Sequence, residues 1–186
     1  MKKFYKLSEF ERGDFYSLSD KIVLNQTIYQ KDLSECYIRQ VQFSNCIFDR
    51  TSFPCTKCQN LTFERCILKN ISFKKSDLED FSFNNCQLTN IDFARSDLMD
   101  FNFMSCKLKH VYFTAGELTD VKIDNSQLQD VYFTGSLLDN VKVKNSTLEK
   151  IEFYGAKAYK ETYKNGVPVA NRTPINDYNS FLKEIS

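Results

Sequence analysis

The hydrophobic residues of this chain recur at every fifth position over more than half of its length. Counting in fives from Ile38 to Phe153, each step lands on Ile, Phe, Leu, Val or Cys, without a slip or an insertion. An amphipathic helix would place apolar residues at intervals of three and four, and a half-buried strand at intervals of two. An unbroken five-residue period instead predicts a repeat protein, in which each repeat packs on its neighbours.

A second set of positions, two residues before each of these, lengthens the period. Bulky residues such as Leu61 and Ile71 alternate there with small ones, which gives a period of ten. Cysteine recurs in this slot at every twentieth residue, and serine then continues the same register: Cys46, Cys66, Cys86, Cys106, Ser126 and Ser146. Twenty residues in four segments describe one turn of a four-sided coil, whose sides are short parallel strands stacked roughly 4.8 Å apart.

The five-residue segments resemble those of the pentapeptide-repeat family, in which a small residue precedes Asp or Asn, then Leu or Phe, then two polar residues. Residues 76–80, Ser-Asp-Leu-Glu-Asp, and residues 96–100, Ser-Asp-Leu-Met-Asp, fit this pattern closely. The resemblance covers about residues 36 to 158 and implies an all-β fold, the right-handed quadrilateral β-helix. The bulky residue at every other inward position departs from the family pattern, and we expect it to widen or flatten the coil.

The ends of the chain are expected to cover the coil. We predict an N-terminal cap over residues 1–30, the β-helix over 31–158, and a C-terminal hairpin and helix over 159–186 that caps or dimerises. Asn165-Gly166 is typical of a hairpin turn, and Pro168 places the second strand at a sheet edge. A short α-helix should follow, because four apolar residues share one helical face: Tyr178, Phe181, Leu182 and Ile185.

The apolar face of this predicted helix needs a surface to cover it. The helix could fold back onto the last coil. With the preceding residues 174–178, however, it resembles the C-terminal module through which quinolone-resistance pentapeptide proteins form tail-to-tail dimers. The resemblance therefore implies a homodimer through these four side chains.

Catalytic and cofactor chemistry have little support in the sequence. The only histidine, His110, is expected to face solvent, and a coil packed with Phe and Leu leaves no cavity for a substrate. Cys55 and Cys58 have the spacing of half a zinc site or of a thioredoxin-like motif, but no second pair follows them. We therefore expect no enzyme, no cofactor and no metal.

The sequence shows neither a membrane-spanning segment nor a secretory signal. No segment approaches the roughly 20 apolar residues needed to span a bilayer. The N-terminal residues carry lysines without the apolar stretch of a secretory signal. These observations predict a cytoplasmic protein with no membrane contact.

The charged residues are unevenly distributed, although the formal net charge is only +1. The outward positions of one predicted wall, anchored by four leucines from Leu78 to Leu138, carry carboxylates and no lysine or arginine: Asp77, Glu79, Asp80, Asp97, Asp100, Glu117, Asp120 and Asp139. Stacked like charges repel, so this column destabilises the fold relative to a scattered placement of the same residues. Basic residues elsewhere are sparse and interrupted, so no direct binding of nucleic acid is expected.

The acidic wall suggests a function. Two carboxylates per coil give roughly one negative charge per 2.4 Å, close to the roughly 1.7 Å of duplex DNA. The resemblance implies more, since its quinolone-resistance members bind DNA gyrase and topoisomerase IV by imitating duplex DNA. It makes a type II topoisomerase the expected partner and resistance to topoisomerase poisons an expected outcome.

Two other interpretations stay open. Asp and Asn are common in the family's second slot, so part of the wall needs no partner. Alternatively, the chain is a protein-interaction scaffold without a topoisomerase role, in which the hairpin or the exposed Tyr112, Tyr132 and Tyr154 make the contact.

Overall fold

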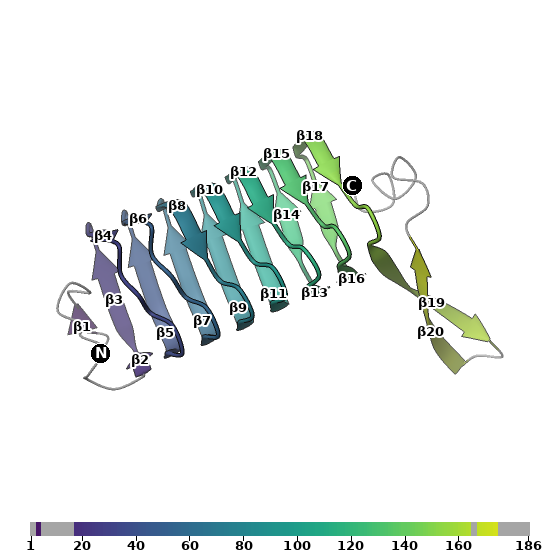
Figure 1. Cartoon of the computed structure of the whole chain (residues 1–186), viewed down its shortest axis with the longest axis horizontal. Helices are drawn as coiled ribbons and strands as arrows, with labels where there is room; N and C mark the ends of the chain where they lie inside the picture. Colours follow the sequence, from purple (N-terminus) through teal and green to yellow (C-terminus); the bar gives the residue numbers. More distant parts are fainter. Residues whose placement is uncertain (1–2, 5–16, 165–166, 175–186) are drawn as a thin grey trace.

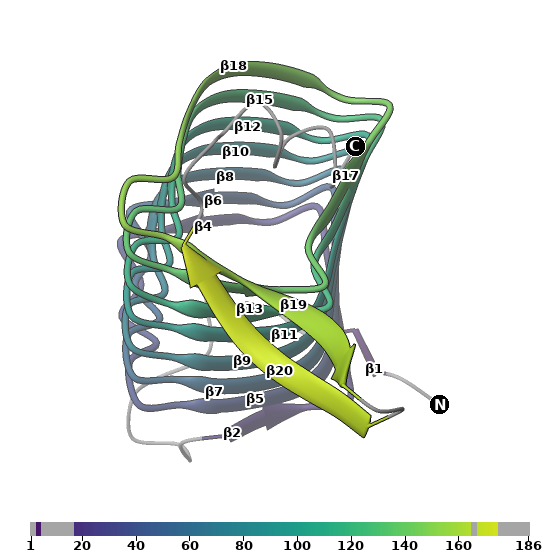
Figure 2. The same cartoon turned by 90° about the vertical axis from the view of Figure 1, so that its right-hand side faces the viewer.

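The computed structural model describes residues 3–4, 17–164 and 167–174. These residues form a coil of stacked strands that advances along one axis, from β3 and β4 at one end to β17 and β18 at the other (Figure 1). Seen from the end, successive coils superimpose, with one sheet above and the long strands of the other below (Figure 2). The predicted all-β solenoid is therefore confirmed.

Two sheets build the coil. The 13-stranded sheet contains β1 (Lys3–Phe4), β2 (Ser17–Ser19), β3 (Lys21–Leu24), β5 (Tyr37–Ser44), β7 (Lys57–Glu64), β9 (Asp77–Asn84), β11 (Asp97–Met104), β13 (Glu117–Thr119), β14 (Lys122–Asp124), β16 (Leu137–Asp139), β17 (Lys142–Lys144), β19 (Lys157–Lys164) and β20 (Val167–Pro174). The 7-stranded sheet contains β4 (Thr27–Tyr29), β6 (Ile47–Asp49), β8 (Ile67–Ser72), β10 (Gln87–Asp92), β12 (Lys107–Tyr112), β15 (Gln127–Tyr132) and β18 (Thr147–Glu152).

Parallel strands pair with a shift of twenty residues, as the sequence predicts. Leu98 on β11, for example, lies opposite Leu78 on β9 and Leu118 on β13. We call the side anchored by these leucines the first wall, and the side anchored by Phe83, Phe103 and Ile123 the second wall. The long strands β9 and β11 each run through both walls.

The third wall is the 7-stranded sheet, and the fourth wall differs from the prediction. Its anchors, such as Phe93 and Phe133, are not in regular strands. The Ser96 N–H donates to the Phe93 carbonyl at 3.2 Å, and Ser136 repeats this bond to Phe133 at 3.1 Å. Closing a turn in this way uses backbone groups that a strand would give to its neighbour. Three sides are thus strands and the fourth is a column of turns.

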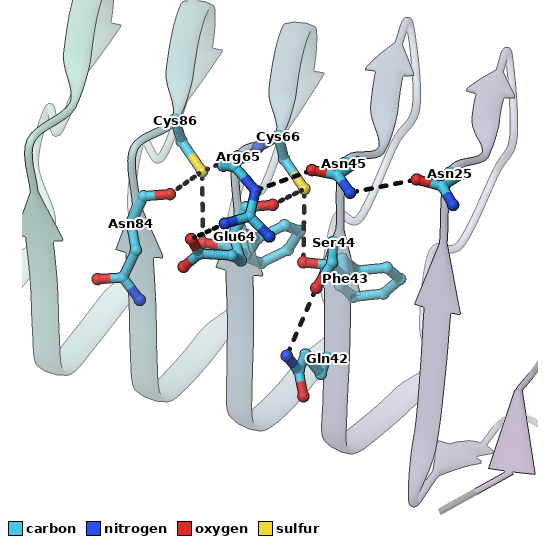
Figure 3. A network of polar contacts seen from close by, with 11 residues as sticks. Asn25, Gln42, Phe43, Ser44, Asn45, Glu64, Arg65, Cys66, Asn84 and Cys86 are labelled. Carbon is cyan, nitrogen blue, oxygen red and sulfur yellow. Dashed lines mark hydrogen bonds and ion pairs between the residues drawn. The ribbon is translucent and has the colours of Figure 1, made fainter.

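Each corner of the coil is a residue in the left-handed conformation. Positive φ recurs at five-residue intervals, for example 56° at each of Asp80, Asp100 and Asp120. Asn and Asp adopt this region most readily among non-glycine residues. Along one edge the corner side chains also bond to each other: Asn45 donates to Asn25 at 3.2 Å, and Arg65 donates to Asn45 at 3.0 Å (Figure 3).

Stacked phenylalanines fill the interior. The rings of Phe83 and Phe103 lie 5.0 Å apart and 5° from parallel, and those of Phe93 and Phe113 lie 5.2 Å apart and 3° from parallel. All four side chains are buried. The five-residue period therefore becomes continuous ladders of aromatic contacts along the axis.

The small inward residues are hydrogen-bonding spacers. The Ser96 hydroxyl donates to the Phe73 carbonyl at 2.6 Å and accepts from the Ser76 N–H at 3.2 Å. The Cys86 thiol makes the equivalent contacts with Phe63 at 3.3 Å and Cys66 at 3.4 Å. A thiol or a hydroxyl in this slot satisfies backbone groups at the corner, which accounts for the recurring Cys and Ser.

The two cysteines with zinc-like spacing do not face each other. Cys55 is an exposed corner residue, whereas Cys58 is buried as an anchor of the first wall. Within the described ranges, no three potential metal ligands gather. The spacing therefore reflects the turn into the first wall.

The ends of the coil carry further strands. Residues 17–29, assigned to the cap from sequence, already pair with the next coil, because β2 and β3 lie parallel to β5 and β4 lies parallel to β6. At the other end β19 pairs antiparallel with β20, bringing Lys164 opposite Val167, which confirms the hairpin. The predicted helix with Tyr178, Phe181, Leu182 and Ile185 lies outside the described residues. No helix long and apolar enough to cross a bilayer occurs in the part of the chain described.

Candidate protein-interaction surface

The first wall brings all eight predicted carboxylates to one side of the coil. Strand register places Asp97 directly between Asp77 and Glu117. Glu79 belongs to a neighbouring column that runs from Gln59 through Glu79, Met99 and Thr119 to Asp139. Coil stacking therefore produces the acidic column that the sequence predicts.

Three of the eight carboxylates have a second explanation. Asp80, Asp100 and Asp120 are corner residues with φ of 56°, where the backbone alone favours Asp or Asn. Asp120 also accepts a hydrogen bond from Asn140 in the next coil. We therefore define the acidic wall by the remaining five: Asp77, Glu79, Asp97, Glu117 and Asp139.

The surface of the acidic wall is hollowed. A groove of about 410 Å³ runs over Leu78 and Leu98, with carboxylates along its sides. Met99 is 48% exposed and lines this groove, and Lys57 lines it from the preceding coil. Sequence reasoning missed both residues. An apolar Met in an outward slot that otherwise carries polar residues was the available signal.

The carboxylates of the acidic wall have one basic neighbour in the strand register, Lys57, which lies opposite Asp77. No ion pair within the described residues involves any of the five. The Gln59 amide donates a hydrogen bond to Glu79 at 3.1 Å. Carboxylates that repel one another around a groove with an apolar floor can hold a cationic group whose aliphatic part contacts Met99.

The single histidine belongs to a corner cluster on another side. His110 Nδ1 lies 3.5 Å from the Asp130 carboxylate, which Lys150 approaches at 3.8 Å. Lys150 and Asp130 thus form an ion pair on the surface of the coil, with His110 beside it.

Of the three tyrosines named as a possible contact surface, the exposed Tyr112 and the half-buried Tyr132 form a pair. Tyr112 and Tyr132 stack at 4.9 Å with 5° between their rings. The next position in register is Glu152, so Tyr154 lies outside the column. The stack is a cross-strand aromatic contact of two residues.

Comparison with known protein families gives two matches. Residues 76–153 match the family described as the pentapeptide repeat region. Residues 3–93 match the family described as the SV2A/B/C luminal domain. No curated protein matches the sequence.

Several solved structures are similar over most of their length. QnrB1, a plasmid-mediated fluoroquinolone resistance protein, is 15% identical, with 88% of this chain and 94% of that chain covered and a TM-score of 0.32. HetL, a pentapeptide repeat protein of the cyanobacterium Nostoc sp. strain PCC 7120 involved in regulating heterocyst differentiation, is 12% identical, with 80% and 90% covered and a TM-score of 0.26. Rfr23 from the cyanobacterium Cyanothece 51142 is 10% identical, with 78% and 85% covered and a TM-score of 0.17.

Proposed function

We propose that the chain, a pentapeptide-repeat β-helix, acts by binding another protein. The sequence period, the coil of parallel strands and the family match all support this premise. The interior is filled with stacked side chains, so functional groups lie on the walls. A rigid wall with side chains at fixed spacing is suited to recognition.

The proposed binding surface is the acidic wall, and its partner is a DNA-binding protein. The observation that carries this proposal is the register of Asp77, Asp97 and Glu117, which places three carboxylates along one line with no ion pair to them among the described residues. A protein surface built to neutralise a row of phosphates would be attracted to such a column. Imitation of duplex charge explains why the fold keeps an arrangement that costs it stability.

Among DNA-binding proteins we propose a type II topoisomerase, DNA gyrase or topoisomerase IV. Support comes from the resemblance to the gyrase-binding pentapeptide proteins, which rests on the chain length, the coil, the acidic column and the apolar pattern of the C-terminal residues. Such a complex would form in the cytoplasm. Relief of quinolone poisoning would be one consequence, and a homodimer through the C-terminal residues would present two acidic walls.

Gyrase supercoiling, measured with increasing amounts of the purified protein and with or without a quinolone, tests this proposal. The wall variant combines Asp77→Asn, Glu79→Gln, Asp97→Asn and Glu117→Gln. We expect wild-type protein to inhibit supercoiling or to relieve the drug, and the wall variant to need at least about tenfold more protein. The variant should stay folded because it removes repulsion between neighbouring strands.

A matched control separates the wall from net charge. It neutralises four carboxylates on the third and fourth walls: Asp49→Asn, Asp92→Asn, Glu149→Gln and Glu152→Gln. Equal loss in both variants would show that only net charge matters. No effect of wild-type protein well above the enzyme concentration would reject the topoisomerase and leave the scaffold interpretation.

A further inference from the structure

A second hollow lies on the second wall, around the corner from the acidic wall. It encloses about 280 Å³ above Phe103 and Ile123. Three lysines line its sides: Lys122 from β14, and Lys142 and Lys144 from β17. The exposed Met104 from β11 also lines it. This hollow lies outside the surface proposed to bind a topoisomerase, and no sequence pattern predicted it.

Basic residues gather here only in the last coils. Lys122 and Lys142 stand in register on the second wall. The preceding residues of the same column are all uncharged: Gln42, Thr62, Ser82 and Asn102. Two lysines directly opposite each other repel and destabilise the strand pair. Because the preceding coils carry neutral residues in the same column, the fold does not require a lysine at these positions.

The three ammonium groups lack partners in the part of the chain described. No ion pair there involves Lys122, Lys142 or Lys144. Asp124 is the one carboxylate lining the hollow; it lies opposite Lys144 in the strand register and accepts a hydrogen bond from Asn145 at 2.9 Å. Three lysines against one carboxylate leave a net charge of about +2 at the hollow.

We propose that this hollow binds a short acidic segment of a partner protein in an extended conformation. Lys142 and Lys144 are alternate residues of β17 and point to the same side, roughly 6.6 Å apart. Asp or Glu side chains at alternate positions of an extended segment have the same spacing. Lys122, one strand away, can pair with a further carboxylate, while the exposed Met104 contacts aliphatic groups.

The surroundings of the hollow favour a peptide over nucleic acid. None of the residues lining the hollow is an exposed aromatic on which a base could stack. A long polyanion leaving the hollow toward β9 would meet the neutral Asn102 and Ser82, and one leaving toward the first wall would meet repelling carboxylates. Three lysines can make few of the phosphate contacts that nucleic-acid binding needs.

Fluorescence anisotropy with two labelled probes tests the proposal. The probes are an oligoglutamate peptide and an oligothymidylate of the same net charge, each titrated with the full chain at low salt and at ~0.15 M salt. The variant Lys122→Gln/Lys142→Gln/Lys144→Gln removes the site. Its control, Lys69→Gln/Lys107→Gln/Lys109→Gln, removes the same charge from exposed positions on the third wall.

We expect the peptide to bind wild-type and control proteins, and the site variant to bind it at least about tenfold more weakly. Absence of peptide binding, or equal loss in both variants, overturns the proposal. Tighter binding of oligothymidylate than of the peptide overturns it in favour of nucleic acid. Circular dichroism checks the fold, and if the triple variant does not fold, Lys142→Gln and Lys109→Gln provide the same comparison.

Discussion

Single residues inside the coil are held in one protonation state by their surroundings. Burial raises the pKa of the Cys58 thiol well above its usual value, and a second thiol nearby, Cys36, adds to the rise. The side chain is 1% exposed. A thiol in this position stays protonated and unreactive.

Alkaline pH should therefore destabilise the protein. The pKa of Cys58 is higher in the folded chain than in the unfolded chain. The stability that comes from keeping this thiol protonated is therefore complete below about pH 9 and is lost as the pH rises further. Each such thiol lowers the free energy of unfolding by up to about 1.4 kcal/mol per pH unit in that range. Urea unfolding between pH 8 and pH 10 should give a shallower decline for Cys58→Ala. Cys55→Ser is the control, and equal slopes for wild-type and Cys58→Ala proteins would contradict this account.

At the scale of strands, the twenty-residue register places like charges opposite each other, so that they repel. Asp97 on β11 lies between Asp77 on β9 and Glu117 on β13, and no cation neutralises it within the described residues. The buried leucines below these strands hold the carboxylates in line. The binding surface proposed for the acidic wall is thus maintained at the expense of strand pairing.

Asp97→Asn should stabilise the isolated protein. Removing the central charge should raise the free energy of unfolding by a few tenths of a kcal/mol at low salt, and by less at ~1 M salt because ions screen the repulsion. Chemical denaturation at both salt concentrations measures the effect. Asp49→Asn, on the third wall, should show no such gain. A destabilised Asp97→Asn protein would mean that this carboxylate supports the fold.

Sequence reasoning predicted those features that depend on which residues stack. The twenty-residue register, the buried Phe and Leu columns and the hairpin before Pro168 follow from spacing and turn chemistry alone. The turns of the fourth wall and the hollows beside Met99 and Met104 depend on side-chain volumes and on backbone bonds at the corners, which spacing does not report. The left-handed corners could have been inferred in part, since Asn or Asp stands at many of these five-residue positions, Asn45, Asp80 and Asn125 among them.

On the scale of the whole molecule, each coil contacts only the coils beside it. The central coils carry phenylalanine ladders, such as Phe63, Phe83 and Phe103, whereas the first coil has Val23 and the last Val143 in the same column. Stability in such a fold is a sum of neighbour contacts, so the ends should open first.

Hydrogen exchange of backbone amides should follow this gradient. We expect the slowest exchange in β9 and β11, and exchange at least about tenfold faster in β3 and β17, because opening an end coil breaks contacts on one side only. Mass spectrometry of peptic fragments near neutral pH measures the rates. Uniform protection along the axis would show that all coils open together.

In the twenty-residue register, the wall on which a side chain lies is set by the position of its residue within the repeat. An insertion of five residues would place Leu anchors in Phe columns and bulky residues in the Cys and Ser slots, and the core would not close. An insertion of ten would preserve both alternations, because the first and third walls share Leu anchors with small neighbours. All later charges would then move to the opposite side of the molecule. Gene changes of thirty nucleotides could thus redistribute this protein's surfaces while its interior stays the same.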